Sequence, residues 1–200
     1  NIGIREGTGR FVLLLNSDTV TSPGQIDVML ETLNQAEQAA VLGPRLIGRD
    51  GRPELSYGPM LSPWNELSQK VLGRLYEERV PLAETLVQYL VSRPRLVDWV
   101  SGACLLVRRA DAEAVGLLDE QYFMYAEDVD FCAALRARGR QILFSPAAEI
   151  LHVPGASRRA APEETTRAYR RSQLAFYAKH HPRWHRALGW YLRAKGARLD

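Results

Sequence analysis

A run of five apolar residues, Phe11–Leu15, follows a glycine-rich turn and ends abruptly at Asn16-Ser17-Asp18. A short run that is apolar at every position is typical of a strand buried on both faces, and it predicts a parallel strand. Further apolar runs at Cys104–Val107 and Gln141–Phe144 predict strands, and helical patterns lie between these runs. Strands that alternate with helices along a chain indicate an α/β fold.

The polar end of the first strand is a candidate ligand site. Ligands of open α/β sheets bind beyond the carboxyl ends of the strands, so Asp18 is placed to hold a metal ion or another ligand. The alternative role for Asp18 is an Asx turn that leads into the next helix. We expect that helix to start at Ser22, Pro23 and Gln25, which match an N-cap, a first-turn proline and a capping box.

Three carboxylates lie within four residues in Glu127-Asp128-Val129-Asp130, directly after the aromatic segment Tyr122–Tyr125. The pattern from Glu127 onward predicts a helix that ends at Gly139. Two interpretations of the carboxylates remain open. The helix dipole and unpaired backbone N–H groups favour carboxylates at a helix start, so the cluster can be a capping device. Alternatively, one carboxylate is a general base that the aromatic loop holds at the rim of a cleft.

Gly102 and His152 are two further candidate site residues, because each lies at an unusual point of a predicted strand. Gly102 interrupts the strand pattern after Val97–Val100, which indicates a bulge or a close approach of backbone. His152 lies near the end of the predicted strand Glu149–Val153, where a structural role and a ligand role are both open. Between the two halves of the chain, residues 57–96 form an irregular, proline-punctuated excursion of the kind that often sets substrate specificity.

Length and composition indicate one soluble globular domain, with 200 residues, 46% hydrophobic and 24% charged. No apolar run approaches the length of a membrane span. The chain begins at Asn1 rather than at Met, so we expect that an upstream portion is absent. Cys104 and Cys132 lie among apolar residues, which predicts buried reduced thiols of a cytosolic protein, with a single disulfide as the alternative.

The net charge of +3 is unevenly distributed. Residues 1–157 carry 15 Lys and Arg against 20 Asp and Glu, whereas residues 158–200 carry 11 against 3. This basic C-terminal tail interleaves cations with Trp184, Trp190 and Tyr191, which suits a helix lying on a membrane surface. A solvated helix that packs these aromatic rings on the domain is the alternative. Nothing in the tail matches a nucleic-acid-binding motif, so we expect no nucleic-acid partner.

Taken together, these segments resemble the family 2 glycosyltransferases, and within them the rhamnosyltransferase-like branch. The resemblance covers most of the chain outside residues 57–96. The segments that carry it are FVLLLNSDT (11–19), WVSGACLLVRR (99–109), GLLDEQYFMYAEDVDFC (116–132), FSPAAEILH (144–152) and residues 169–180.

The resemblance implies a GT-A fold, which is a Rossmann-like, mostly parallel sheet with helices on both faces. The part of that fold that holds the nucleoside would precede Asn1. We therefore expect a partial GT-A catalytic domain at residues 1–157, with 57–96 as a variable acceptor-side excursion, and a basic helical tail at 158–200.

The resemblance also implies roles for individual residues. The family's E-D motif matches Glu127-Asp128, which makes Asp128 the candidate base and Glu127 its catalytic neighbour. The family's metal-binding loop matches Asn16-Ser17-Asp18, so Asp18 would hold a divalent metal, Mg²⁺ or Mn²⁺, with His152 as a further ligand. Donor or acceptor contacts are expected at Asn16, Asp18, Trp99, Gly102, Ala103 and Tyr125.

The function implied is inverting transfer of a sugar, such as rhamnose, from a nucleotide-sugar donor to a saccharide or lipid-linked acceptor in cell-surface polysaccharide synthesis. Such an enzyme would be cytoplasmic and peripheral at the inner membrane face. The alternative is a GT-A module that binds a nucleotide-sugar or a partner without turnover. A metal-dependent phosphoryl transferase or hydrolase is a second alternative function. Such an enzyme would need a cluster of several carboxylates, whereas this loop provides only Asp18.

Overall fold

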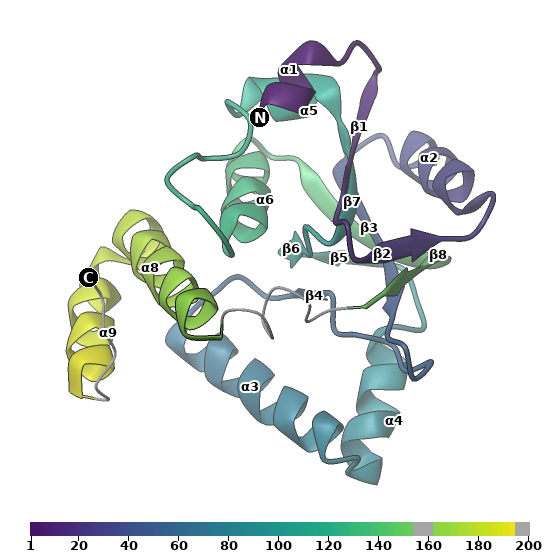
Figure 1. Ribbon diagram of the computed structural model, residues 1–200. Coiled ribbons are helices and arrows are strands. Elements are labelled where there is room, and N and C mark those ends of the chain that lie inside the picture. The colour runs from purple at the N-terminus through teal and green to yellow at the C-terminus, as the bar shows by residue number, and fades with distance from the viewer. Residues whose placement is uncertain (154–161, 195–200) are drawn as a thin grey trace.

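The computed structural model describes residues 1–153 and 162–194, and Figure 1 shows the arrangement of their helices and strands. The strands are β1 (Phe11–Leu15), β2 (Thr19–Thr21), β3 (Ala39–Ile47), β4 (Tyr57–Gly58), β5 (Arg95–Val97), β6 (Trp99–Val100), β7 (Cys104–Arg108) and β8 (Gln141–His152). The helices are α1 (Ile2–Glu6), α2 (Gln25–Gln35), α3 (Pro63–Glu77), α4 (Pro81–Leu90), α5 (Arg109–Ala114), α6 (Glu127–Ala137), α8 (Pro162–His180) and α9 (Pro182–Ala194).

Among the described residues, the central sheet has the strand order β1-β7-β3-β8-β2, and β5 pairs with β8 as well. The predicted α/β class is confirmed, but the sheet is mixed rather than mostly parallel. Only β3 and β8 pair in parallel among these strands, and β1 pairs antiparallel with β7. The apolar run Phe11–Leu15 therefore predicted a strand correctly and its direction wrongly, because β1 is a partly buried edge strand rather than a central parallel one.

Helices cover both faces of this sheet. On one face, Phe131 and Leu135 of α6 pack on Val41, Val107 and Phe144 of the strands. The opposite face meets α2, whose buried residues contact the alternate positions of the same strands. The change of face from one strand residue to the next reflects the twofold side-chain period of a β-strand. Figure 1 shows α2 and α6 on opposite sides of the sheet.

The start of α2 differs from the prediction. The helix begins at Gln25 after Gly24, whose φ of 82° is left-handed, and no side chain caps it. The expected capping box at Ser22 is therefore absent. Gln25 instead accepts a hydrogen bond from the Glu149 backbone N–H through its side-chain oxygen, at 2.7 Å. A tertiary contact to β8 has replaced the local cap.

The excursion and the tail each contribute helices outside the central sheet and its two covering layers. Residues 57–96 contain α3 and α4, and α8 lies between α6 and the outermost helix, α9 (Figure 1). Phe176 and Tyr177 of α8 are buried, whereas Trp184 and Trp190 of α9 are exposed. The expected domain boundary after residue 157 lies outside the described residues, as do Lys195 and Arg198. Both cysteines are buried free thiols, which settles the disulfide alternative.

The close packing of β3 against β6 gives a test of the fold. A Cβ added at Gly43 would lie 2.6 Å from Val100 Cβ, so we expect Gly43→Ala to lower the free energy of unfolding by roughly 1–3 kcal/mol. Gly73, inside α3, has nothing within 4 Å of such a Cβ. Gly73→Ala should therefore raise the same free energy by roughly 0.5–1 kcal/mol. Urea unfolding of both variants measures these changes, and an unaffected Gly43→Ala protein would contradict the packing.

Candidate active site

Asp128 lies in the first turn of α6, and both of its carboxylate oxygens accept backbone hydrogen bonds. Oδ2 accepts from Gly102 N–H at 2.7 Å, and Oδ1 accepts from Val129 N–H at 2.8 Å. Burial raises the pKa of Asp128 above its usual range, and these hydrogen bonds oppose that rise. The contact with Val129 gives a partner to one of the free N–H groups in the first turn of α6. The contact with Gly102 ties the carboxylate to the connection between β6 and β7, which is distant in sequence.

Gly102 permits this approach because it has no side chain. A Cβ at Gly102 would lie 3.3 Å from Asp128 Cβ, which is closer than most Cβ contacts, and 3.5 Å from Oδ2. The close backbone approach expected at this glycine is therefore present, and the carboxylate is what approaches it.

Glu127 is the second carboxylate of the pair. Its Oε2 is buried and has no hydrogen-bond partner among the described residues. Burial, together with the negative charge of Asp128, raises the pKa of Glu127 to about 7. Two neighbouring carboxylates whose pKa values are raised, in the first turn of one helix, are typical of a site that handles protons.

The connection between β6 and β7 also reaches the loop after β1. Ala103 is buried, and its carbonyl accepts a hydrogen bond from Asn16 N–H at 2.9 Å. Successive residues Gly102 and Ala103 thus contact the Asp128 carboxylate and the Asn16-Ser17-Asp18 loop. This short segment therefore connects the candidate base, Asp128, to the candidate metal-binding loop that contains Asp18.

Asp18 and His152 lie together, with 3.6 Å between Asp18 Oδ1 and His152 Nε2. The expected proximity is present, but it does not come from the carboxyl ends of two neighbouring parallel strands. The chain reverses after Asn16, where Thr19 N–H and Oγ1–H both donate to the Asn16 carbonyl. Strand β2 then pairs antiparallel with β8, and Thr19 is opposite His152.

Glu54, which sequence analysis did not single out, completes this group. Its Oε2 lies 2.8 Å from His152 Nδ1, so Glu54 orients the ring with Nε2 toward Asp18. This hydrogen bond raises the pKa of His152, and burial opposes the rise. No local pattern marks Glu54, because it reaches His152 only after the turn at Asp50-Gly51 returns the chain to β3, where Glu54 N–H donates to Leu46.

The group formed by Asp18, His152 and Glu54 has one feature that suits a divalent cation, which is a buried carboxylate oxygen that accepts no hydrogen bond from a described residue. Asp18 Oδ1 is buried and has no hydrogen-bond partner among the described residues, and His152 Nε2 faces it at 3.6 Å. A carboxylate-oriented histidine beside a free carboxylate oxygen is a common way to hold such an ion. Within residues 1–153 and 162–194, however, no group of three or more His, Cys, Asp or Glu side chains could hold a metal ion by itself.

Trp99 and Tyr125 lie at the border of the site. Trp99 donates from Nε1 to the Pro59 carbonyl at 2.9 Å, which attaches the start of the excursion to β6. Tyr125 is 39% exposed and directly precedes the N-cap of α6. The expected site residues therefore form two groups, Asp128 with Gly102 and Asp18 with His152, which Ala103 and Asn16 connect.

Comparison with known proteins places the chain in a family. Residues 1–187 match the family described as glycosyltransferase like family 2. N-acetylglucosaminyl-diphospho-decaprenol L-rhamnosyltransferase of Mycobacterium tuberculosis is 35% identical over 184 residues, which are 92% of this chain and 60% of that protein. Rhamnosyltransferase WbbL of Escherichia coli is 32% identical over 84 residues, or 42% of this chain and 32% of that protein.

The chain spans about 60% of the length of the mycobacterial relative. Among solved structures, the crystal structure of GalNAc-T7 with UDP, GalNAc and Mn²⁺ superposes with a TM-score of 0.52. That likeness covers 88% of this chain and 35% of the other chain at 14% identity, so it concerns the fold, which is the GT-A arrangement. Because the family match extends over nearly the whole chain, the chain belongs to the family 2 glycosyltransferases.

Proposed function

We propose that this chain acts as an inverting glycosyltransferase of cell-surface polysaccharide synthesis. It would transfer rhamnose or a similar hexose from a nucleotide-sugar to a saccharide or lipid-linked acceptor. The observation that carries the proposal is the Asp128 carboxylate, which two backbone N–H groups fix in place. The names of the mycobacterial and Escherichia coli relatives support the sugar and the acceptor class.

Asp128 is the base of the proposed reaction. The acceptor hydroxyl gives its proton to the carboxylate, and its oxygen bonds to the anomeric carbon as the bond from that carbon to the diphosphate breaks. A raised pKa makes the carboxylate a stronger base than an exposed aspartate. The N–H groups of Gly102 and Val129 hold it in one orientation, so little reorganisation precedes the proton transfer.

A divalent cation is the proposed cofactor, held by Asp18 and His152 while Glu54 orients the histidine. Bound there, it would neutralise the charge that develops on the leaving diphosphate. Two protein ligands suit such an ion, because phosphate oxygens and waters commonly complete its shell. The buried Oδ1 of Asp18, which accepts no hydrogen bond from a described residue, supports this assignment.

Replacing Asp128 separates its role from that of Glu127. Asp128→Asn should lower the rate of transfer by roughly 10²–10⁴-fold, the usual contribution of a general base. Either amide orientation places an NH₂ group against a backbone N–H, so we also expect a loss of roughly 1–3 kcal/mol in the free energy of unfolding. Rates are therefore measured well below the melting temperature. A larger loss of transfer in Glu127→Gln than in Asp128→Asn would assign the base to Glu127.

The proposed cation site is tested with three variants, Asp18→Ala, His152→Ala and Glu54→Gln. Each should raise the Mn²⁺ concentration needed for half-maximal transfer, Asp18→Ala most, and Glu54→Gln by about 10–100-fold as an indirect partner. Direct titration of Mn²⁺ into the protein with nucleoside diphosphate checks the same order without turnover. Asp27→Ala, at an exposed position on α2, is the control. Unchanged Mn²⁺ requirements in all three variants would argue against a metal at this place.

We also propose that α9 places the protein on the inner face of a membrane. Its outward side carries Trp184 and Trp190, which are 48% and 79% exposed, together with Arg183 and Arg186. The helix contains no acidic residue. Aromatic rings and cations on one side of a helix suit the headgroup region of an anionic bilayer. No helix of residues 1–153 and 162–194 is long and apolar enough to cross a bilayer.

Vesicle co-sedimentation tests this surface. The protein should pellet with phosphatidylglycerol vesicles more than with phosphatidylcholine vesicles, and added salt should weaken binding. Arg186→Gln should lower affinity about fivefold, which corresponds to about 1 kcal/mol for one cation near the surface. Trp190→Ala should weaken it as well, whereas Trp64→Ala, at a tryptophan of α3 that is 73% exposed, should not. Equal pelleting with both lipids would contradict the proposal.

A further inference from the structure

The loop that leads into α6 has an unusual backbone. Tyr125 and Ala126 both have a φ of 66°, although neither is glycine. Such conformations cost energy in residues with a side chain, and they persist where surrounding contacts over-determine them. Ala126 is the N-cap of α6, so this pair of residues sets the direction in which Glu127 and Asp128 enter the helix.

Helix α8 supplies contacts to this loop. Ser172 is buried, and its hydroxyl donates to the Met124 carbonyl at 2.6 Å, directly before the left-handed pair. The ring of Tyr169 meets the ring of Tyr125 edge to face, with 5.7 Å between the centroids. The loop is thus held by a backbone hydrogen bond and by an aromatic contact, both from the same helix.

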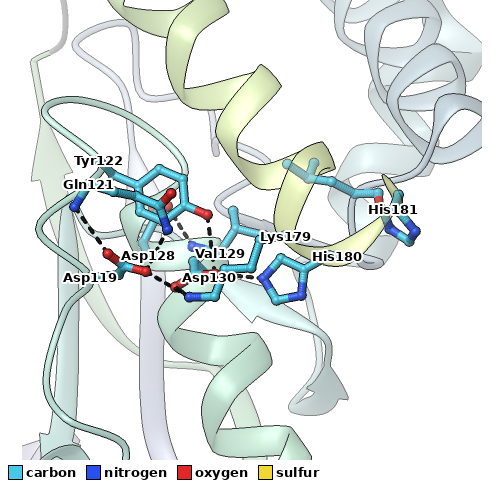
Figure 2. A network of polar contacts seen from close by, with 10 residues as sticks. Asp119, Gln121, Tyr122, Asp128, Val129, Asp130, Lys179, His180 and His181 are labelled. Carbon is cyan, nitrogen blue, oxygen red and sulfur yellow. Dashed lines mark hydrogen bonds and ion pairs between the residues drawn. The ribbon is translucent and has the colours of Figure 1, made fainter. Parts of the chain in front are cut away.

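The other end of α8 holds the helix start itself, as Figure 2 shows. Asp130 is 2% exposed and lies two residues after Asp128. Its carboxylate contacts Lys179 Nζ at 2.8 Å and His180 Nε2 at 2.6 Å, and it accepts from the Tyr122 hydroxyl at 3.2 Å. A carboxylate that is buried this deeply requires such partners, because the cost of losing its water is large.

Lys179 also extends this network to the beginning of the loop. Its ammonium donates to Asp119 Oδ2 at 2.8 Å, and this hydrogen bond lowers the pKa of Asp119. Beneath these polar contacts, Phe176 and Tyr177 of α8 pack with Tyr122 and Val129. The contacts from α8 therefore bracket the loop at Asp119, Met124 and Asp130, on both sides of the strained residues.

We propose that α8 positions the reacting carboxylate. Lys179 and His180, acting through Asp130, and Ser172, acting through Met124, hold residues 119–130 in the conformation that presents Asp128 to the acceptor. These are positioning residues, and the inference rests on the proposed function. The tail that sequence analysis separated from the catalytic domain is, in its first helix, part of the apparatus that holds the site.

The experiment compares Lys179→Met and Ser172→Ala with Arg171→Met. Arg171 is exposed on the same helix, and its side chain makes no hydrogen bond or ion pair with a described residue. Amide hydrogen exchange is measured first, without substrate. We expect faster exchange across residues 122–130 in the first two variants, unchanged exchange in β3 and β7, and wild-type behaviour in Arg171→Met.

Transfer kinetics supply the second readout. We expect kcat to fall by up to about 100-fold with little change in the KM for the donor, because a small displacement of a base is costly. Lys179→Arg should recover part of the loss. Unchanged loop exchange in both variants overturns the inference. Faster loop exchange with kcat equal to that of Arg171→Met also overturns it, because α8 would then be a scaffold only.

Failure of the proposed function itself is distinguishable. If the wild-type protein transfers no sugar from any donor, the proposed reaction and the catalytic part of this inference both fail. The exchange comparison would still decide whether α8 holds the loop, because it requires no turnover.

Discussion

The hydrogen bond between Gly102 N–H and Asp128 Oδ2 is the contact on which the arrangement of this site depends. It connects α6 to the segment between β6 and β7, where a Cβ on residue 102 would lie only 3.3 Å from Asp128 Cβ. The next residue, Ala103, accepts the hydrogen bond of Asn16 and so fixes the loop that carries Asp18. Two peptide units of one short connection thereby hold both halves of the candidate site in place.

The two halves are held in different ways. Asp18 and His152 are fixed by the pairing of β2 with β8, which belongs to the central sheet and shares its rigidity. The carboxylate pair on α6 follows a loop with a strained backbone, whose opposite side rests on α8. The Asp18–His152 half is therefore held rigidly, whereas the Glu127–Asp128 half depends on a peripheral helix. In the proposed reaction, the leaving diphosphate needs fixed charge, whereas the acceptor has to enter and leave.

Local patterns predicted what depends on local sequence. The α/β class, the helix at Glu127 and the glycine approach at Gly102 follow from periodicity and from residue type. The direction of β1 and the start of α2 were wrong, because strand pairing and the Gln25–Glu149 contact are decided by distant residues. Glu54 was missed for the same reason, since only the register of a hairpin brings it to His152. The strain at Tyr125 and Ala126 has no sequence signal, because neither residue is glycine.

The attachment of residues 57–96 has a consequence for how such an enzyme can diverge. The first residues of the excursion, 58–60, are fastened to the chain before β6 and to its first residue through their main chain. The carbonyl of Gly58 accepts from Asp98 N–H, that of Pro59 accepts from Trp99, and Met60 N–H donates to Asp98. Residue types other than proline share the same main-chain groups, so the side chains of residues 58–60 can be exchanged while these contacts with Asp98 and Trp99 are preserved. In an enzyme of the proposed kind, this border can therefore change its side chains without disturbing the strand that leads to Gly102 and the Asp128 carboxylate.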